Sequence, residues 1–175
     1  MVIVPSEAQH FIAGYQWLLA EIYLQSNGNP NVDVLEMLAE ARELVNITPS
    51  LLDAAATKLE STGQPVAADV LAAIKTLQLK QWVFLRETTK YAIFVEENGE
   101  QAYGVLGLTD HISDIIGGSA ATFTAGLFEY HGQYVCDGIF KNYVRLGPNL
   151  KSEYNETLRQ LKKNGGFHTT IPRFL

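Results

Sequence analysis

Gln81-Trp82-Val83-Phe84-Leu85-Arg86-Glu87 is followed by a second run of the same kind, Tyr91-Ala92-Ile93-Phe94-Val95-Glu96-Glu97. Both runs are rich in aromatic and β-branched residues, which favour the pleated surface of a strand. Asn98-Gly99 comes next, and both of these residues tolerate the positive φ angles of a type I′ turn. We therefore predict a β-hairpin, with residues 100–108 as the return strand.

The sequence before this hairpin has the period of helices. Its apolar residues recur at steps of three and four, the spacing that gives a helix one apolar face. Capping residues and prolines indicate where such helices begin. We predict four helices within residues 1–79, beginning at Ser6, Asp33, Pro49 and Pro65.

The sequence after the hairpin combines strands with two inserted helices. Thr109-Asp110 is predicted to cap a short helix over residues 111–116, and Gly147-Pro148 to begin a longer one that ends at 164–166. The predicted strands cover residues 121–130, 133–136, 142–146 and 167–171, and His131-Gly132 is the turn between the first two.

This order of elements predicts an α+β fold. A bundle of about four helices, residues 1–79, is expected to pack on a second domain, residues 80–175. We expect that domain to be an antiparallel sheet or partial barrel with the two inserted helices. No Pro/Gly/Ser-rich linker lies at Leu79-Lys80, so the halves are expected to pack together.

Composition excludes several classes of protein. The chain has 175 residues, and 47% of them are hydrophobic, which is too many for a disordered chain. The net charge is −6, so the chain as a whole is not a general nucleic-acid binder. Residues 138–175 nevertheless hold seven Lys/Arg against two Glu. This basic segment is expected to attract either the acidic helical half or an anionic partner.

The sequence also bears on the cellular compartment. Cys136 is the single cysteine, so no disulfide can form within one chain. No apolar run approaches the ~18 residues of a membrane span, and the start of the chain lacks the pattern of a secretory signal. We expect a soluble cytoplasmic protein that has no membrane partner.

Residues that could support catalysis are present but not in diagnostic patterns. Cys136 could act as a nucleophile with a histidine as base, but its strand pattern favours a buried, inert thiol. The histidines show no metal-binding spacing, so we predict neither a metal site nor a cofactor. Neither nucleotide-binding glycine motif occurs.

The candidate binding residues are Asp137, His131, Lys141 and Arg145. Asp137-Gly138 could hold a ligand at a strand end, although we favour a turn because Asp-Gly is good turn chemistry. Lys141 and Arg145 belong to a basic stripe that continues along the last helix. That stripe could face phosphate groups, although cations near a helix C-terminus also interact favourably with the helix dipole.

Part of the chain resembles a known family. The matching residues are Tyr130-His131-Gly132, Val135-Cys136-Asp137-Gly138-Ile139, Leu146-Gly147, Tyr154, Gly165-Gly166 and Pro172, preceded by Leu106-Gly107-Leu108-Thr109-Asp110. Over roughly residues 80–172 the chain resembles an uncharacterised family of prokaryotic cytoplasmic proteins, a domain of unknown function that in some members carries a SEC-C zinc motif. The cysteine-rich tail is missing here, so zinc is not implied. The resemblance implies an ordered domain and carries no activity.

Two functions follow as hypotheses. The first is a non-catalytic binding or regulatory module that acts through the C-terminal domain on a protein partner, a second copy of the chain or a nucleic acid. The alternative is an enzyme of unknown class, such as a hydrolase, with a polar site around Asp137. That alternative requires Asp137 to meet His131 or His168 in a pocket.

Overall fold

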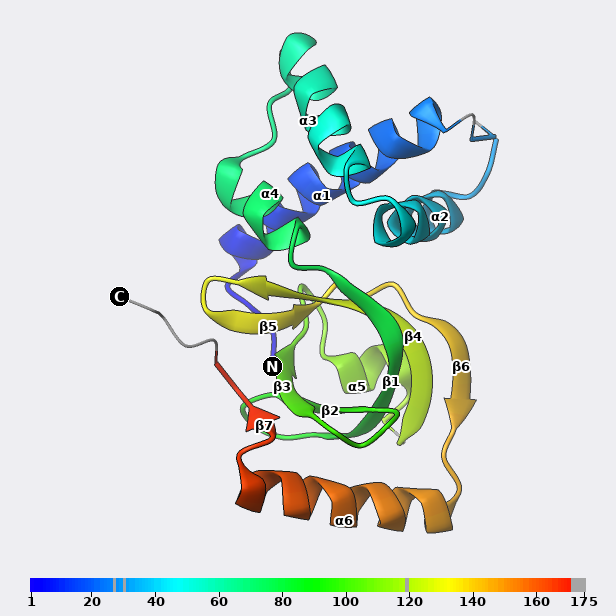
Figure 1. Ribbon diagram of the computed structural model, residues 1–175, viewed down its shortest axis with the longest axis vertical. Helices are drawn as coiled ribbons and strands as arrows, with labels where there is room; N and C mark the ends of the chain where they lie inside the picture. The colour runs from blue at the N-terminus through cyan, green and yellow to red at the C-terminus, as the bar shows by residue number, and fades with distance from the viewer. Residues whose placement is uncertain (27, 30, 119, 171–175) are drawn as a thin grey trace. The chain divides into compact units, whose positions relative to one another are not determined.

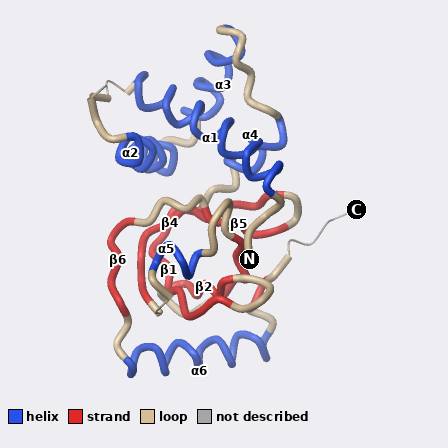
Figure 2. The backbone as a smooth tube through the Cα atoms, turned by 180° about the vertical axis from the view of Figure 1, so that it is seen from behind, coloured by secondary structure: helices blue, strands red, loops and turns tan. Residues whose placement is uncertain are grey.

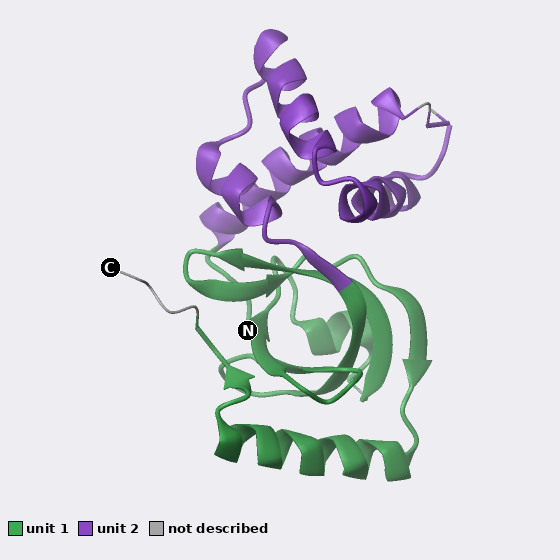
Figure 3. Cartoon of the chain, viewed as in Figure 1, with its two compact units in different colours: residues 1–4, 80–175 green, residues 5–79 purple. Residues whose placement is uncertain are grey.

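The computed structural model describes residues 1–26, 28–29, 31–118 and 120–170. The chain divides into two compact units (Figure 3). We call residues 5–79 the helical unit, and residues 1–4 with 80–175 the β unit. The described residues form six α-helices and seven strands, which confirms the predicted α+β class. None of the described helices has the length and apolar character needed to cross a membrane.

The helical unit contains the four predicted helices. They are α1 (Pro5–Gln25), α2 (Val34–Ile47), α3 (Leu51–Ser61) and α4 (Ala68–Ile74). α1 packs against each of the other three, and its buried side includes Phe11, Leu18 and Ile22. The second helix is predicted to begin at Asp33, and Asp33 caps α2, because its carboxylate accepts the backbone N–H groups of Leu35 and Glu36. The apolar period of the sequence therefore gives one shared interior.

The start of the fourth helix differs from the prediction. α4 begins at Ala68 instead of Pro65, since Ala67 is extended, with ψ 142°. Val66 therefore precedes the helix, but it still lies over α1. A Cβ on Gly14 would come within 3.3 Å of Val66 and 3.0 Å of Val70. The segment that contains Val66 and Val70 therefore packs closely against Gly14.

The β unit is built around a ring of strands with a helix outside it (Figures 1 and 2). The strand order is β1-β2-β3-β5-β4-β6; β1 also pairs with β4, and β7 pairs with β3. The strands are β1 (Gln78–Glu87), β2 (Ala92–Glu96), β3 (Ala102–Leu106), β4 (Ala121–Tyr130), β5 (Gln133–Cys136), β6 (Lys141–Arg145) and β7 (Phe167–His168). The helices are α5 (Ile112–Ile116) and α6 (Pro148–Asn164).

The sheet is mixed, and this corrects the expectation of an antiparallel one. β3 runs parallel to both β5 and β7. Parallel neighbours need a long crossover connection. α5 and β4 provide it between β3 and β5, and α6 lies in the connection that leads to β7. The predicted strand over 167–171 is shorter, and Ile171 lies outside the described residues.

The type I′ turn occurs at a different hairpin from the one that the sequence predicts. Asn98 keeps a negative φ, so the first hairpin has no type I′ turn; Gly99 alone is left-handed, at φ 73°. Its N–H donates to Glu96 O, and five residues, 97–101, lie between the end of β2 and the start of β3. The type I′ geometry occurs instead at His131-Gly132, where φ is 49° and 80°.

The strands separate two apolar clusters. The inner cluster contains Trp82, Phe84 and residues of α5, and the indole N–H of Trp82 donates to Ala125 O at 3.0 Å. The outer cluster contains Val83, Leu85 and the α6 residue Leu158. Successive side chains of a strand point to opposite faces, so Trp82 and Phe84 face the inner cluster while Val83 between them faces the outer one.

Candidate functional site

An irregularity in β1 decides where its charged residues point. Phe84 pairs with Phe94, but Arg86 pairs with Ile93, so β1 carries a β-bulge between Phe84 and Arg86. Strict alternation would place Arg86 on the inner face with Phe84. The bulge instead places Arg86 opposite Ile93, a member of the outer cluster. Arg86 therefore reaches α6, where its Nη1 donates to Asn155 Oδ1 at 2.5 Å.

The C-terminal half of α6 lies beside Arg86. Gly147 precedes the helix, Pro148 is its first residue, and Gly165 ends it in the left-handed conformation at φ 79°, all as predicted. Leu158 is buried in the outer cluster, and exposed residues lie close to it in the helix. These residues include three cations, Arg159, Lys162 and Lys163.

Arg86 and α6 line a groove of about 470 Å³. Its lining consists of Arg86, Asn155, Leu158, Arg159, Lys162 and Lys163. We call it the basic groove, because four of its six residues are cations and no acidic residue is among the described residues that line it. Asn155 is itself held in place, since its amide donates to Lys151 O at 2.7 Å. The groove therefore has an apolar floor, a fixed amide and four positive groups.

Part of the positive charge at the basic groove is balanced locally. Arg159 forms an ion pair with Glu156, whose pKa lies below its ordinary value because of hydrogen bonds from Gln160 and Arg159. Lys162 Nζ lies 4.9 Å from the centre of the Phe167 ring. The C-terminus of α6 also favours cations. The helix dipole does not explain Arg86, however, because Arg86 comes from β1.

Asp137 and His131 lie at opposite ends of β5. Asp137 is buried, and its Oδ1 accepts the N–H groups of Gly126 at 3.2 Å and Ile139 at 3.1 Å. These contacts make Asp137 part of the turn, as the Asp-Gly pair predicts. His131 is exposed on the hairpin turn and stacks on the Tyr130 ring. His168 contacts Gln101, so the structure does not bring these groups to one pocket.

The other two candidate binding residues, Lys141 and Arg145, lie outside the basic groove. Lys141 and Arg145 are the first and last residues of β6, and they pair with Thr124 and Ala121 of β4. Neither residue is part of the basic groove. Cys136 is fully buried in β5, as its strand pattern predicts. The described residues contain no group of three or more His, Cys, Asp or Glu side chains that could hold a metal ion.

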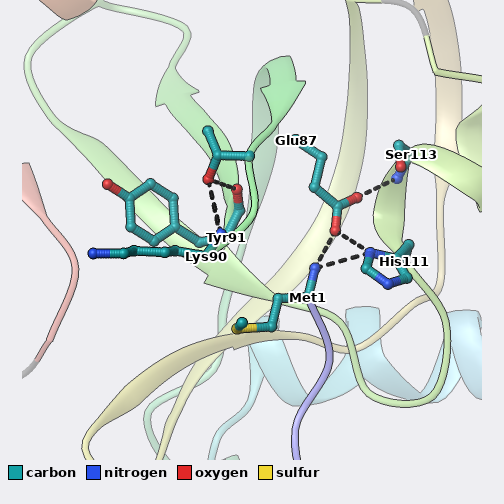
Figure 4. Close-up of polar contacts among 7 residues, drawn as sticks. Met1, Glu87, Lys90, Tyr91, His111 and Ser113 are labelled. Carbon is teal, nitrogen blue, oxygen red and sulfur yellow. Dashed lines mark hydrogen bonds and ion pairs between the residues drawn. The ribbon is translucent and has the colours of Figure 1, made fainter.

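A second polar cluster surrounds Glu87 (Figure 4). Its Oε1 contacts the amino group of Met1 and lies 2.5 Å from His111 Nδ1, and its Oε2 accepts the Ser113 N–H at 2.9 Å. Ser113 lies in the first turn of α5, so Glu87 supplies the carboxylate that stabilises this helix start. The predicted cap is wrong: α5 begins after His111, and Thr109 donates to Asp110 instead.

Arg86, Asn155 and Glu87 are not among the candidate residues that the sequence predicts. One signal was available, because Arg86-Glu87 places two opposite charges directly after the apolar run 82–85. Such a pair at a strand end indicates side chains that leave the apolar interior. The bulge that sets which of the two charges lies on which face has no local signature in the sequence.

Comparisons with protein families, with curated proteins and with solved structures find no match for this chain.

Proposed function

We propose that the β unit is a non-catalytic binding module that holds an anionic partner in the basic groove. One observation carries this proposal: a β-bulge adds Arg86 to three cations of α6 around one groove. Like charges that are brought together repel one another. A bound anion would relieve that repulsion and accept hydrogen bonds from the guanidinium and ammonium groups.

The lining of the basic groove supports binding more than catalysis. It offers hydrogen-bond donors and positive charge. Nucleophilic and acid–base catalysis most often use Ser, Cys, His or a carboxylate. None of these side chains is among the described residues that line the groove. The hydrolase alternative needed Asp137 beside a histidine, and the geometry above gives it no support.

Negative charge defines the class of partner. An acidic protein, a second copy of the chain and a nucleic acid all carry it. Residues 5–79 hold three Lys/Arg against nine Asp/Glu, so a second copy offers an acidic surface. We also propose a cytoplasmic location, which is supported by a single, buried cysteine that can form no disulfide within the chain.

Retention on immobilised heparin, a general polyanion, tests the proposal. One variant carries Arg159→Gln, Lys162→Gln and Lys163→Gln. Its matched control carries Lys141→Gln, Arg145→Gln and Lys151→Gln, which removes the same charge outside the groove. We expect the groove variant to elute at clearly lower salt than the control, with both folded by circular dichroism. Equal elution of the two variants, or no retention of the unmodified protein at low salt, would contradict the proposal.

A further inference from the structure

We infer that the basic groove recognises a phosphomonoester group on a small molecule. This inference rests on the proposed function, since it names the class of anion that the groove takes. Three features of the groove carry it: the arrangement of its guanidinium groups, its net charge and its size.

The first feature is a guanidinium that is fixed before any ligand binds. Asn155 Oδ1 accepts from Arg86 Nη1 at 2.5 Å, and the Asn155 amide donates in turn to Lys151 O at 2.7 Å. Arginine carries five N–H donors in a planar fork, so this contact orients Arg86 and leaves donors for a ligand. Arg159 brings a second guanidinium from α6; its Nη2 is paired with Glu156, and its five N–H groups include further donors for a ligand. Two planar forks suit the tetrahedral oxygens of a phosphate, which accept paired hydrogen bonds.

The second feature is the amount of positive charge around one groove. Four cations line the groove, and Glu156 beside it offsets one of them. A phosphomonoester carries about −1.5 to −2 charges near pH 7, whereas each phosphodiester in a nucleic acid carries a single negative charge. A doubly charged group therefore gains more from this groove than a diester or a carboxylate does.

The third feature is that the positive charge does not extend over the unit. Residues 80–175 hold ten Lys/Arg and ten Asp/Glu. Lys80 is paired with Glu96 at 2.6 Å, and Lys141 and Arg145 lie on β6, outside the groove. A nucleic acid needs cations along an extended track. The groove of about 470 Å³ instead has the size of a small-molecule site, typically ~300–1,000 Å³.

Titration of the full chain with methyl phosphate and with dimethyl phosphate tests this inference. The two probes differ by one methyl group and by the second negative charge. We expect methyl phosphate to shift the side-chain N–H resonances of Arg86 and Arg159 in NMR spectra and to bind at least tenfold more tightly than dimethyl phosphate. The groups that face the probe are Arg86, Arg159, Lys162 and Lys163, with Glu156 beside them. Because the second pKa of the probe is about 6, we expect binding to weaken severalfold from pH 8 to pH 5.

Arg86→Lys keeps the charge and removes the fork, so we expect it to weaken methyl phosphate binding about tenfold. Lys141→Gln removes a charge outside the groove and should leave binding within twofold. Equal affinity for the two probes overturns the inference. Binding of a single-stranded oligonucleotide or of polyaspartate at the groove without methyl phosphate binding also overturns it and leaves the proposed function standing. The absence of binding by every probe, heparin included, overturns both.

Discussion

Arg86 and Glu87 are neighbours in β1, yet they connect to helices on opposite faces of the strand. Arg86 Nη1 donates to Asn155 of α6 at 2.5 Å, and Glu87 Oε2 accepts the Ser113 N–H of α5 at 2.9 Å. Arg86 pairs with Ile93 of the outer cluster, and Glu87 pairs with Ala92 of the inner one. The end of β1 therefore contacts both helices of the β unit. The bulge just before it sets which of the two charged residues lies on the α5 side and which on the α6 side.

Replacing Glu87 by Gln should destabilise the β unit by about 1–3 kcal/mol at pH 7, the usual effect of losing a hydrogen bond to a charged group. Burial raises the pKa of Glu87, but hydrogen bonds from the N-terminal ammonium, Ser113 and His111 lower it by more. The net effect takes the pKa from 4.5 to about 2. Because the folded-state pKa lies below the unfolded one, this stabilisation is present above about pH 4.5 and is lost as the pH falls toward 2. Urea denaturation from pH 7 to pH 2 measures it.

The control for this experiment is Glu153→Gln, which changes an exposed carboxylate on α6. Such a substitution should alter the free energy of unfolding by no more than about 0.5 kcal/mol. If Glu87→Gln and Glu153→Gln show the same dependence on pH, Glu87 does not stabilise the start of α5.

Asp137→Ala should cost about 2–4 kcal/mol, because it leaves the N–H groups of Gly126 and Ile139 without their carboxylate acceptor in a buried turn. Asp137→Asn keeps an acceptor oxygen of the same shape and should cost less than half as much. Thermal denaturation of the two variants gives the comparison. Equal losses would mean that the negative charge of Asp137, and not its acceptor geometry, supports the turn.

Gly132→Ala should destabilise the β4–β5 hairpin by about 1–2 kcal/mol, since Gly132 has φ 80° and a Cβ is unfavourable there. Gly132→Asn should cost clearly less, because asparagine tolerates the left-handed region better. Chemical denaturation distinguishes the two variants at one position. An alanine variant as stable as the unmodified protein would show that the turn does not need its type I′ geometry.

Tyr103→Phe should change the alkaline stability of the β unit. Burial raises the pKa of Tyr103 to about 12, with further contributions from Glu96, Tyr134 and Glu129. The folded-state pKa lies above the ordinary value of 10, so this stabilisation is present below about pH 10 and is lost as the pH rises toward 12. We expect the variant to lose less stability over that interval.

The difference in tyrosinate absorbance between the unmodified protein and Tyr103→Phe reports this phenol directly. Its midpoint should lie near pH 12, as the pKa of Tyr103 indicates. A midpoint near pH 10 would show that the ring is more hydrated than its contacts with Trp82 and Tyr134 indicate.

Local chemistry in the sequence was enough to predict most elements. The strand over 121–130 and the boundaries of α6 match the prediction because alternation, Pro148 and Gly165 act within a few residues. Asn98-Gly99 shows the limit of this reasoning. The dipeptide suits a type I′ turn, but Glu96 N–H pairs with Gln101 O, and the longer loop selects a different geometry.

The sequence by itself determined the α+β class, the positions of the helices and strands, and the basic character of the last helix, because these depend on hydrophobic period, caps and charge along a short stretch. The basic groove was decided only by the tertiary structure. Arg86 and Lys163 are far apart in the chain, and they meet because β1 pairs with β2 through a bulge while α6 covers the outer cluster. A bulge is a property of the pairing between two strands, so the direction of Arg86 follows from long-range packing and not from the residues beside it.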